Sequence, residues 1–182
     1  MSDDGHDADE AHAFVGMGSN LGDRLAILRA AADAMHRGVL PETTLLATSS
    51  IYETRPIGSS TQPYLNAAVL LRTRLPPRLL LAELLELEAV HGRRRTQPWG
   101  ARTLDLDLLL YVPTGRDLSL RIDRLDLRLP HPELEHRDFA LAPLAELDDT
   151  VPVYAGQPAS ALLEALPDRQ RTILQRLDAQ LL

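Results

Sequence analysis

The segment RTLDLDLLLY at residues 102–111 alternates polar and apolar side chains before it becomes continuously apolar. Side chains on a β-strand point alternately to its two faces, so this pattern predicts a strand over Thr103–Tyr111. Asp105 and Asp107 then share one face, and the leucines between and beside them pack on the other. Asp is disfavoured in strands, so two of them in strict alternation weaken the interpretation that this is an ordinary solvated strand face.

Two neighbouring carboxylates repel each other, and a hard divalent cation with phosphate oxygens is a common way to compensate them. The pair alone leaves open both a metal site and a half-exposed strand. Its context favours the metal site, because the segments GRRR at 92–95 and WGAR at 99–102 precede it directly. Guanidinium groups bind phosphate in a bidentate manner, and phosphoryl transfer needs such charges beside a metal. A solvated basic turn is the alternative for these arginines.

The rest of the chain supplies the other elements of an α+β fold. Apolar periodicity, Gly and Pro predict the order β-α-β-β-α-β, the ferredoxin-like arrangement of an antiparallel sheet with helices packed on one face. Additional C-terminal helices follow, of which Thr172–Leu181 is the clearest. The predicted strands are Ala13–Met17, Thr44–Glu53, Leu65–Leu75 and Thr103–Tyr111; the predicted helices are Arg24–Arg37 and Pro77–His91; the loops between them include Arg55–Pro63 and Arg93–Ala101.

Length and composition limit the possible functions. A chain of 182 residues suits one domain, predicted over 12–182, and residues 1–11, with five acids, predict a disordered acidic tail. The chain has no Cys and no Lys, which excludes disulfides, thiol nucleophiles, Schiff bases and the P-loop lysine. A net charge of −7 without a basic run at either end of the chain argues against a nucleic-acid partner, and no apolar stretch suits a membrane partner. We therefore expect a cytoplasmic protein.

Several blocks of sequence occur in one order: GSNLGD at 18–23, QPYLNAAV at 62–69, GR at 92–93, WGARTLDLD at 99–107, LPHP at 129–132 and RDF at 137–139. In these blocks, over about residues 13–147, the chain resembles the 6-hydroxymethyl-7,8-dihydropterin pyrophosphokinases of folate biosynthesis. The resemblance implies transfer of the pyrophosphoryl group of MgATP to the hydroxymethyl group of the reduced pterin, with release of AMP. It also implies a monomer whose partners are these two small molecules.

The resemblance implies roles for particular residues. Two Mg²⁺ ions would lie between the phosphates and the metal ligands Asp105 and Asp107, which with Arg93 and Arg102 form the catalytic set. The pterin would contact Thr54, Ile57, Tyr64, Asn66, Trp99 and Phe139, with Tyr64 and Phe139 stacking on its ring. ATP would contact Glu88, Arg93, Arg95, Trp99, Arg102, His131 and Arg137. Closure of the loops 55–63 and 93–99 over the site is a further expectation.

The chain departs from the family pattern at a few positions. Ala101 and Arg55 stand where Pro is usual or common, and Asp126 replaces a basic residue found in some members. Arg128 and Pro132 occupy positions that contact the nucleotide in other members. Three other functions compete with the resemblance: another ATP-dependent transferase on the same sheet, an RNA-binding module, and a small-molecule sensor. An RNA-binding module would carry aromatic residues on its central strands, where this chain has Ala, Leu and Asp.

Overall fold

The computed structural model describes residues 10–56, 61–92, 103–116 and 118–182. Its main sheet is antiparallel, with the strand order β5-β1-β4-β3-β8, and β2 also pairs with β4. A two-stranded sheet, β6-β7, lies beside it. The strands are β1 Ala11–Ser19, β2 Thr43–Thr48, β3 Tyr52–Thr54, β4 Tyr64–Thr73, β5 Asp105–Pro113, β6 Ile122–Arg124, β7 Leu127–Leu129 and β8 Ile173–Arg176.

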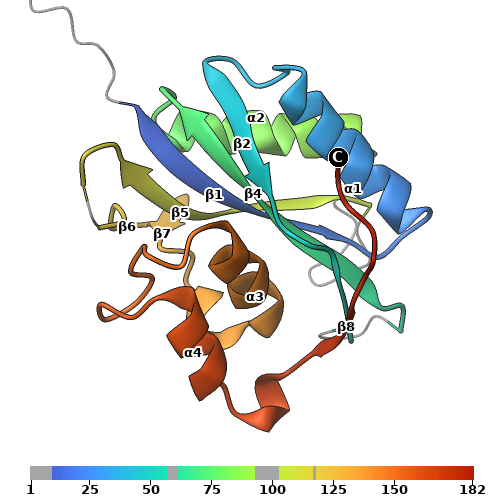
Figure 1. The fold of residues 1–182 in the computed structure, drawn as a ribbon. Coiled ribbons are helices and arrows are strands. Elements are labelled where there is room, and N and C mark those ends of the chain that lie inside the picture. The colour runs from blue at the N-terminus through green and yellow to red at the C-terminus, as the bar shows by residue number, and fades with distance from the viewer. Residues whose placement is uncertain (1–9, 57–60, 93–102, 117) are drawn as a thin grey trace, which may run out of the picture.

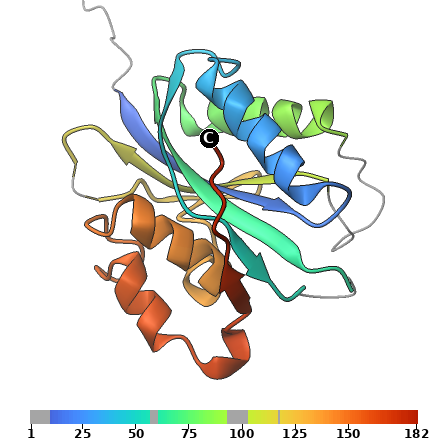
Figure 2. The ribbon, with the colours of Figure 1, turned by 45° about the vertical axis from the view of Figure 1, so that its right-hand side comes forward.

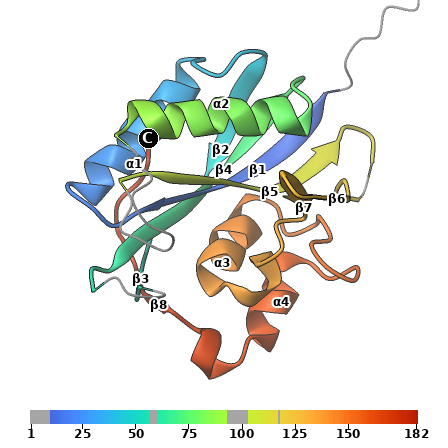
Figure 3. The same ribbon diagram turned by 180° about the vertical axis from the view of Figure 1, so that it is seen from behind.

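Helices cover both faces of the main sheet (Figure 1). On one face lie α1 Arg24–His36 and α2 Pro77–Val90, and on the other lie α3 Asp138–Leu147 and α4 Ala159–Ala165, as Figure 3 shows from behind. Short 3-10 turns at Leu134–His136 and Asp168–Gln170 connect these helices to the strands. The α+β prediction is confirmed, and the helices α1 and α2, which lie in the predicted βαββαβ segment, share one face of the sheet, while the later helices α3 and α4 cover the second face.

The two faces of β1 explain this layering. Ala13 and Val15 point into the apolar core under α1 and α2, whereas Phe14 points into a second core under α3 and α4. Buried apolar residues on both faces of a strand require cover on both sides. The sequence of β1 therefore already requires cover on the second face of the sheet.

Local signals fix the two helices of the first layer. The Asp23 side chain caps α1 by accepting a hydrogen bond from Ala26 N at 3.1 Å, and Gly38, at φ +80°, follows its end. Pro77 opens α2, where its missing N–H costs nothing. Both helices bury one face, in agreement with the predicted ranges.

The single strand predicted over Thr44–Glu53 forms two strands. Both β2 and β3 pair with β4, but residues 49–51 between them leave the ladder. There the Ser49 hydroxyl accepts a hydrogen bond from Ala68 N at 2.8 Å, and buried Ile51 packs into the first core. A side chain replaces part of the backbone pairing, so the strand is interrupted.

The helix predicted over Thr172–Leu181 is wrong. Residues 173–176 form β8, which pairs with β3, and residues 177–182 continue as an irregular segment that ends beside α1 (Figure 2). The Arg29 guanidinium donates to Gln180 O at 2.9 Å, and Leu181 is buried in the first core. The apolar spacing that predicted a helix instead serves an edge strand and a single anchoring leucine.

Candidate active site

Three neighbouring strands place an amide and two carboxylates on one face of the sheet. In β1, Gly18 pairs with Asp105 of β5 on one side and with Asn66 of β4 on the other. The next row on the same face joins Gly16 to Asp107. Strands in a sheet lie about 4.8 Å apart, so Asn66 and Asp105 are separated by roughly 10 Å across the central glycine.

The two glycines of β1 leave the space between these side chains open. A Cβ atom on Gly18 would lie 3.1 Å from Asn66 Oδ1, and one on Gly16 would lie 3.3 Å from Leu109 Cδ1. At either position, a side chain would make a tight contact with its neighbour. The result is a cavity of about 380 Å³, floored by these glycines and lined by the two aspartates and Asn66.

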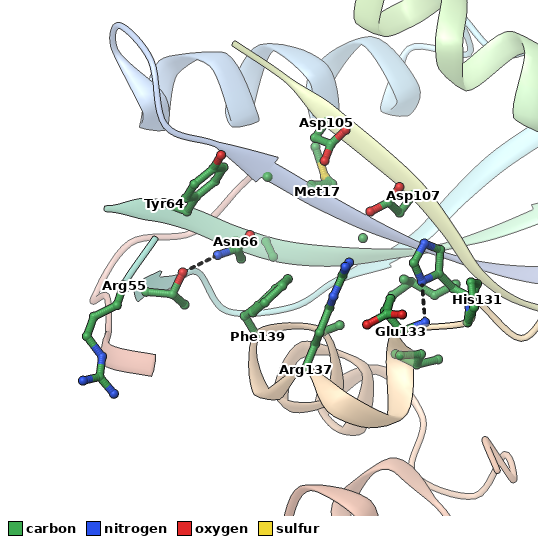
Figure 4. A pocket seen from close by; sticks show the side chains of 18 residues that line it. Met17, Arg55, Tyr64, Asn66, Asp105, Asp107, His131, Glu133, Arg137 and Phe139 are labelled. Carbon is green, nitrogen blue, oxygen red and sulfur yellow. Dashed lines mark hydrogen bonds between the residues drawn. The ribbon is translucent and has the colours of Figure 1, made fainter. Parts of the chain in front are cut away.

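The Asn66 amide is held by a second buried polar side chain. Asn66 Nδ2 donates to Thr54 Oγ1 at 2.8 Å, and both residues are buried. This bond, drawn in Figure 4, fixes the plane of the amide. An amide presents both donors and an acceptor, so a fixed Asn66 can recognise the polar edge of a heterocycle.

Two aromatic side chains enter the cavity from different elements. Tyr64 comes from the start of β4 and Phe139 from the first turn of α3, with Asn66 between them in the view of Figure 4. Arg24 fixes the backbone of the residue before Tyr64, because Arg24 Nη1 donates a hydrogen bond to Pro63 O at 2.8 Å. The guanidinium carbon of Arg137 lies 5.7 Å from the centre of the Phe139 ring. Paired aromatic rings beside a fixed amide suit a flat, polar-edged ring system.

A bulge in β5 aims His131 at the carboxylates. The register between β1 and β5 shifts at Phe14/Val15, and the carbonyl of Leu109 accepts a hydrogen bond from His131 N at 2.9 Å. His131 Nδ1 accepts from Glu133 N at 3.3 Å. The neutral ring therefore carries its proton on Nε2 and presents that N–H as a donor.

The protonation of His131 is set by opposing influences. Burial lowers the pKa of His131 below its ordinary value, Asp107 opposes this shift, and the Arg137 guanidinium adds to it. Glu133 and Asp105 act in the same sense as Asp107. At neutral pH the ring is uncharged and serves as a hydrogen-bond donor rather than as a cation.

Glu88 lies behind the aspartate pair rather than in the cavity. Its carboxylate belongs to α2, is only 1 % exposed, and accepts a hydrogen bond from Leu106 N at 2.6 Å. Leu106 stands between Asp105 and Asp107 on β5, an edge strand of the sheet. Glu88 thus satisfies an edge N–H that no strand pairs, and it fixes the backbone that carries both aspartates.

The donor set fits magnesium. Asp105 and Asp107 offer carboxylate oxygens on one wall of the cavity, and the adjacent glycines leave room for an ion and its other ligands. Among the described residues, no three His, Cys, Asp or Glu side chains gather to hold a metal by themselves. Mg²⁺ is commonly bound by one or two carboxylates, with waters and substrate phosphates completing the octahedron. The site therefore suits an ion delivered with a phosphate substrate.

The structure brings most of the predicted site residues into this one cavity. These are Thr54, Tyr64, Asn66, Asp105, Asp107, His131, Arg137 and Phe139. Five predicted residues lie outside the described part of the chain: Ile57, Arg93, Arg95, Trp99 and Arg102. Sequence reasoning gave no role to Gly16, Met17, Arg55 or Glu133, which also line the cavity. Alternation along β1 was the available signal for Gly16, but Glu133 could be found only from the path of the loop.

Comparison with known proteins gives the family. The family model for 7,8-dihydro-6-hydroxymethylpterin-pyrophosphokinase (HPPK) matches residues 14–149. Three similar proteins are each named 2-amino-4-hydroxy-6-hydroxymethyldihydropteridine pyrophosphokinase. The one from Haemophilus influenzae is 36 % identical over 87 % of this chain and 94 % of its own length. Those from Pseudomonas aeruginosa and Bacillus subtilis are 40 % and 42 % identical, over 85 % and 74 % of this chain and 91 % and 77 % of their own lengths.

Solved structures show the same fold at low identity. A crystal structure of HPPK-DHPS in complex with substrates matches with a TM-score of 0.59 and 13 % identity, over 86 % of this chain. Wild-type Plasmodium falciparum HPPK-DHPS matches with a TM-score of 0.60 and 14 % identity, over 85 % of this chain. This chain spans 43 % and 41 % of those two longer chains.

Proposed function

Since the chain belongs to the 7,8-dihydro-6-hydroxymethylpterin-pyrophosphokinase family, we propose that it transfers the pyrophosphoryl group of ATP to 6-hydroxymethyl-7,8-dihydropterin in folate biosynthesis. The observation that carries the proposal is the row Asn66–Gly18–Asp105, which sets a fixed amide opposite a carboxylate pair across one open cavity. The amide end suits the pterin, and the carboxylate end suits metal-bound phosphates.

At the pterin end, Asn66 pairs with the polar edge of the ring, with its amide plane held by Thr54. Tyr64 and Phe139 stack on the two faces of the ring. This arrangement directs the hydroxymethyl group towards the aspartates. Binding of the ring thus orients the attacking oxygen of the hydroxymethyl group. Such positioning of the nucleophile is a large part of catalysis in phosphoryl transfer.

At the phosphate end, Asp105 and Asp107 would hold magnesium, which the family resemblance puts at two ions. Magnesium bound there would neutralise the triphosphate and would lower the pKa of the substrate hydroxyl. Arg137 adds a positive charge, and the Nε2–H of His131 donates to a phosphate oxygen. The substrate oxygen attacks the β-phosphorus, the bond to the α,β-bridging oxygen breaks, AMP leaves with that oxygen, and the hydroxyl proton passes to solvent.

The remaining predicted residues keep their proposed roles. The resemblance alone assigns ATP contacts to Arg93, Arg95, Trp99 and Arg102. It also assigns pterin contacts to Trp99 and Ile57. Glu88 is assigned to the nucleotide too, but its buried bond to Leu106 N supports an indirect role, in which it fixes the strand that carries both aspartates.

The finer architecture belongs to the same proposal. The strand order β5-β1-β4-β2 and the helices α1 and α2 on one face support a ferredoxin-like βαββαβ core. The predicted tail included Ala11, but Ala11 is the first residue of β1 and is buried in the first core. We therefore propose one domain over 11–182, preceded by an acidic tail, acting as a cytoplasmic monomer without a nucleic-acid or membrane partner. In the described part of the chain, no helix has the length and apolar character to cross a membrane.

AMP formation from MgATP, with and without 6-hydroxymethyl-7,8-dihydropterin, tests the function. Wild type should form AMP only with the pterin, and Asp107→Ala should abolish this activity. Asp123→Ala is a matched control, because it removes a carboxylate that is 91 % exposed and lies outside the main cavity. Formation of ADP, or AMP formation that ignores the pterin, would contradict the assignment.

A further inference from the structure

Asp138 lies between two cavity residues but does not line the cavity itself. Its neighbours Arg137 and Phe139 both do. Asp138 is the first residue of α3 and is 2 % exposed. A carboxylate buried to this degree requires compensating hydrogen bonds, and its partners show what it does.

Among the described residues, the hydrogen bonds to this carboxylate come from Thr172 and Ile173, where the chain enters β8. Oδ2 accepts from Thr172 N at 2.5 Å and from Ile173 N at 2.8 Å. Oδ1 accepts from Thr172 Oγ1 at 2.6 Å. An Asp in a first helical turn commonly accepts from its own helix, whereas this one binds residues 34 and 35 positions further along the chain.

The same segment is tied to the opposite wall of the cavity. Thr172 O accepts a hydrogen bond from Arg55 N at 2.9 Å, and Arg171 O accepts from Arg55 Nη2 at 2.5 Å. In the sheet, Thr54 pairs with Ile173 on one side and with Tyr64 on the other. Thr172 therefore lies at the centre of a chain of contacts that runs from Phe139 to Tyr64.

We propose that Asp138 and Thr172 form a positioning pair that fixes the gap between the Phe139 and Tyr64 rings, and so sets the affinity for the flat ring of the acceptor. The pair touches neither substrate. It acts by holding the start of α3 against the β3 edge of the sheet. The proposal rests on the proposed function, because it takes the space between the two rings as the pterin site.

The metal ligands at the phosphate end should be insensitive to this pair, whereas Arg137, which adjoins Asp138 and is assigned to the phosphates, should be affected in part. Asp105 and Asp107 stand on β5, at the other edge of the main sheet from β8, and β1 and β4 lie between β5 and β3. Loss of the pair should therefore change pterin affinity much more than ATP affinity. A merely structural role, in contrast, would lower stability and affect both substrates alike.

Four variants of the full chain test the pair: Asp138→Ala, Thr172→Val, Thr172→Ser and the control Asp149→Ala. Thr172→Val removes one of the three donors while it keeps the backbone bonds, and Thr172→Ser restores the hydroxyl. Asp149 is matched in chemistry, because its carboxylate accepts from Ser160 N at 2.9 Å and from the Ser160 hydroxyl, away from the cavity.

The measurements are fluorescence titration with 6-hydroxymethylpterin and the KM values for ATP and for the dihydropterin. Hydrogen bonds to charged groups are strong enough that Asp138→Ala should raise the pterin Kd and KM about 10-fold or more. Thr172→Val should cause a smaller rise that Thr172→Ser reverses. The ATP KM should change less than about 2-fold in the two Thr172 variants and should rise less than the pterin KM in Asp138→Ala, where the adjacent Arg137 is affected in part. Asp149→Ala should leave pterin binding unchanged.

The outcomes separate this inference from the proposed function. A wild-type protein that does not bind the pterin would overturn both. Wild-type binding with unchanged pterin affinity in Thr172→Val and Asp138→Ala would overturn only the positioning pair. Equal rises in the KM values for ATP and for the pterin in these variants would also overturn only the positioning pair. If Asp138→Ala fails to fold, the comparison of Thr172→Val with Thr172→Ser decides the question alone.

Discussion

Gly18 has the most constrained position in the cavity floor. Alanine there would bring a Cβ atom to 3.1 Å from Asn66 Oδ1, which is tighter than nine in ten Cβ contacts in proteins. The Asn66 amide would have to move and would strain its bond to Thr54. A shift of a few tenths of an ångström at a positioning residue lowers catalysis, so we expect Gly18→Ala to reduce kcat/KM for the pterin by roughly 10- to 100-fold.

Steady-state kinetics with varied pterin would measure this loss, and thermal unfolding would show whether the variant remains folded. Asn66→Ala in the same background provides the cross-check. If Gly18 acts through the Asn66 amide, the double variant should be little worse than Asn66→Ala alone. Fully additive losses would show that Gly18 acts on something else.

Glu88 gives a second prediction for a single side chain. Glu88→Ala leaves the buried Leu106 N–H without its acceptor, which costs about 1–3 kcal/mol. It also frees the strand between Asp105 and Asp107, so we expect a higher Mg²⁺ requirement for activity. Glu88→Gln keeps an acceptor oxygen and should retain most of the activity.

The control for Glu88 is Glu86→Ala, an exposed glutamate on the same helix. Urea unfolding and a magnesium titration of the AMP-forming activity would compare the variants. A Glu88→Ala protein with normal stability and a normal magnesium profile would contradict the indirect role.

The sequence predicted the residues that line the cavity better than the residues that support them. Asp105, Asp107 and Asn66 carry recognisable spacing and motifs. In contrast, Glu88 was expected at the nucleotide and proved to be buried against Leu106 N. Its partner is 18 positions away and is chosen by the packing of α2 on the edge of the sheet. No local pattern contains that information.

At the scale of elements, Tyr52 links β3 to α3. Its hydroxyl donates to Glu146 Oε1 at 2.5 Å, and Ser50 N donates to Glu146 Oε2 at 2.7 Å. Burial, together with the hydrogen bond and the charge of Glu146, raises the pKa of Tyr52 to about 12. Burial alone would raise the pKa of Glu146, but the hydrogen bonds from Tyr52 and Ser50 outweigh it and lower the pKa.

These shifts fix the pH range of the link. The raised pKa of Tyr52 stabilises the fold below pH 10, and this contribution is lost as the pH rises towards 12. The lowered pKa of Glu146 stabilises the fold above pH 4.5 and is lost at lower pH. Tyr52→Phe should therefore cost about 1 kcal/mol of unfolding free energy at pH 7 and less at pH 10.5 or pH 4. Urea unfolding at the three pH values would measure the difference, and a constant difference would contradict the assigned link.

Prediction of the elements failed where partners are distant. Residues 172–181 have helical apolar spacing, yet the N–H groups of Thr172 and Ile173 bind the Asp138 carboxylate. The residues that follow them form the edge strand β8, whose partner strand, β3, lies more than one hundred residues earlier in the chain. In α1, by contrast, the capping residue and the stop signal are local, and the predicted range agrees with the helix.

At the scale of the whole molecule, the last residues secure the first core. Leu181 is 2 % exposed within that core, whereas its neighbour Leu182 is 52 % exposed. Leu181→Ala should therefore lower the unfolding free energy by about 2–4 kcal/mol through lost burial and a residual cavity. Leu182→Ala should change it by less than about 0.5 kcal/mol.

Chemical denaturation of both variants tests the anchoring of this segment. The pair is well matched, since the residue type, the substitution and the neighbourhood in sequence are the same. Equal effects of the two substitutions would show that the segment does not hold the core together in solution.

The antiparallel sheet and the first helical layer follow from alternation and periodicity that lie within single segments. The second helical layer could be inferred only in outline, because Phe14 and Leu110 show that β1 and β5 bury both faces without saying what covers them. The order in which distant strands meet is a property of the assembled chain, and here it decides the shape of the cavity beside Thr54 and Tyr64.

The pairing of β3 with β8 has a consequence in time. Glu53 and Gln175, which are bonded across these strands, are 122 residues apart. At a translation rate of about 5–20 residues per second, the ribosome makes the second of them roughly 6 to 25 s after the first. Throughout that interval the outer edge of β3 has no strand beside it, and an open edge can pair with other chains. The nascent protein is therefore most exposed to misassembly in the seconds before its last strand is made.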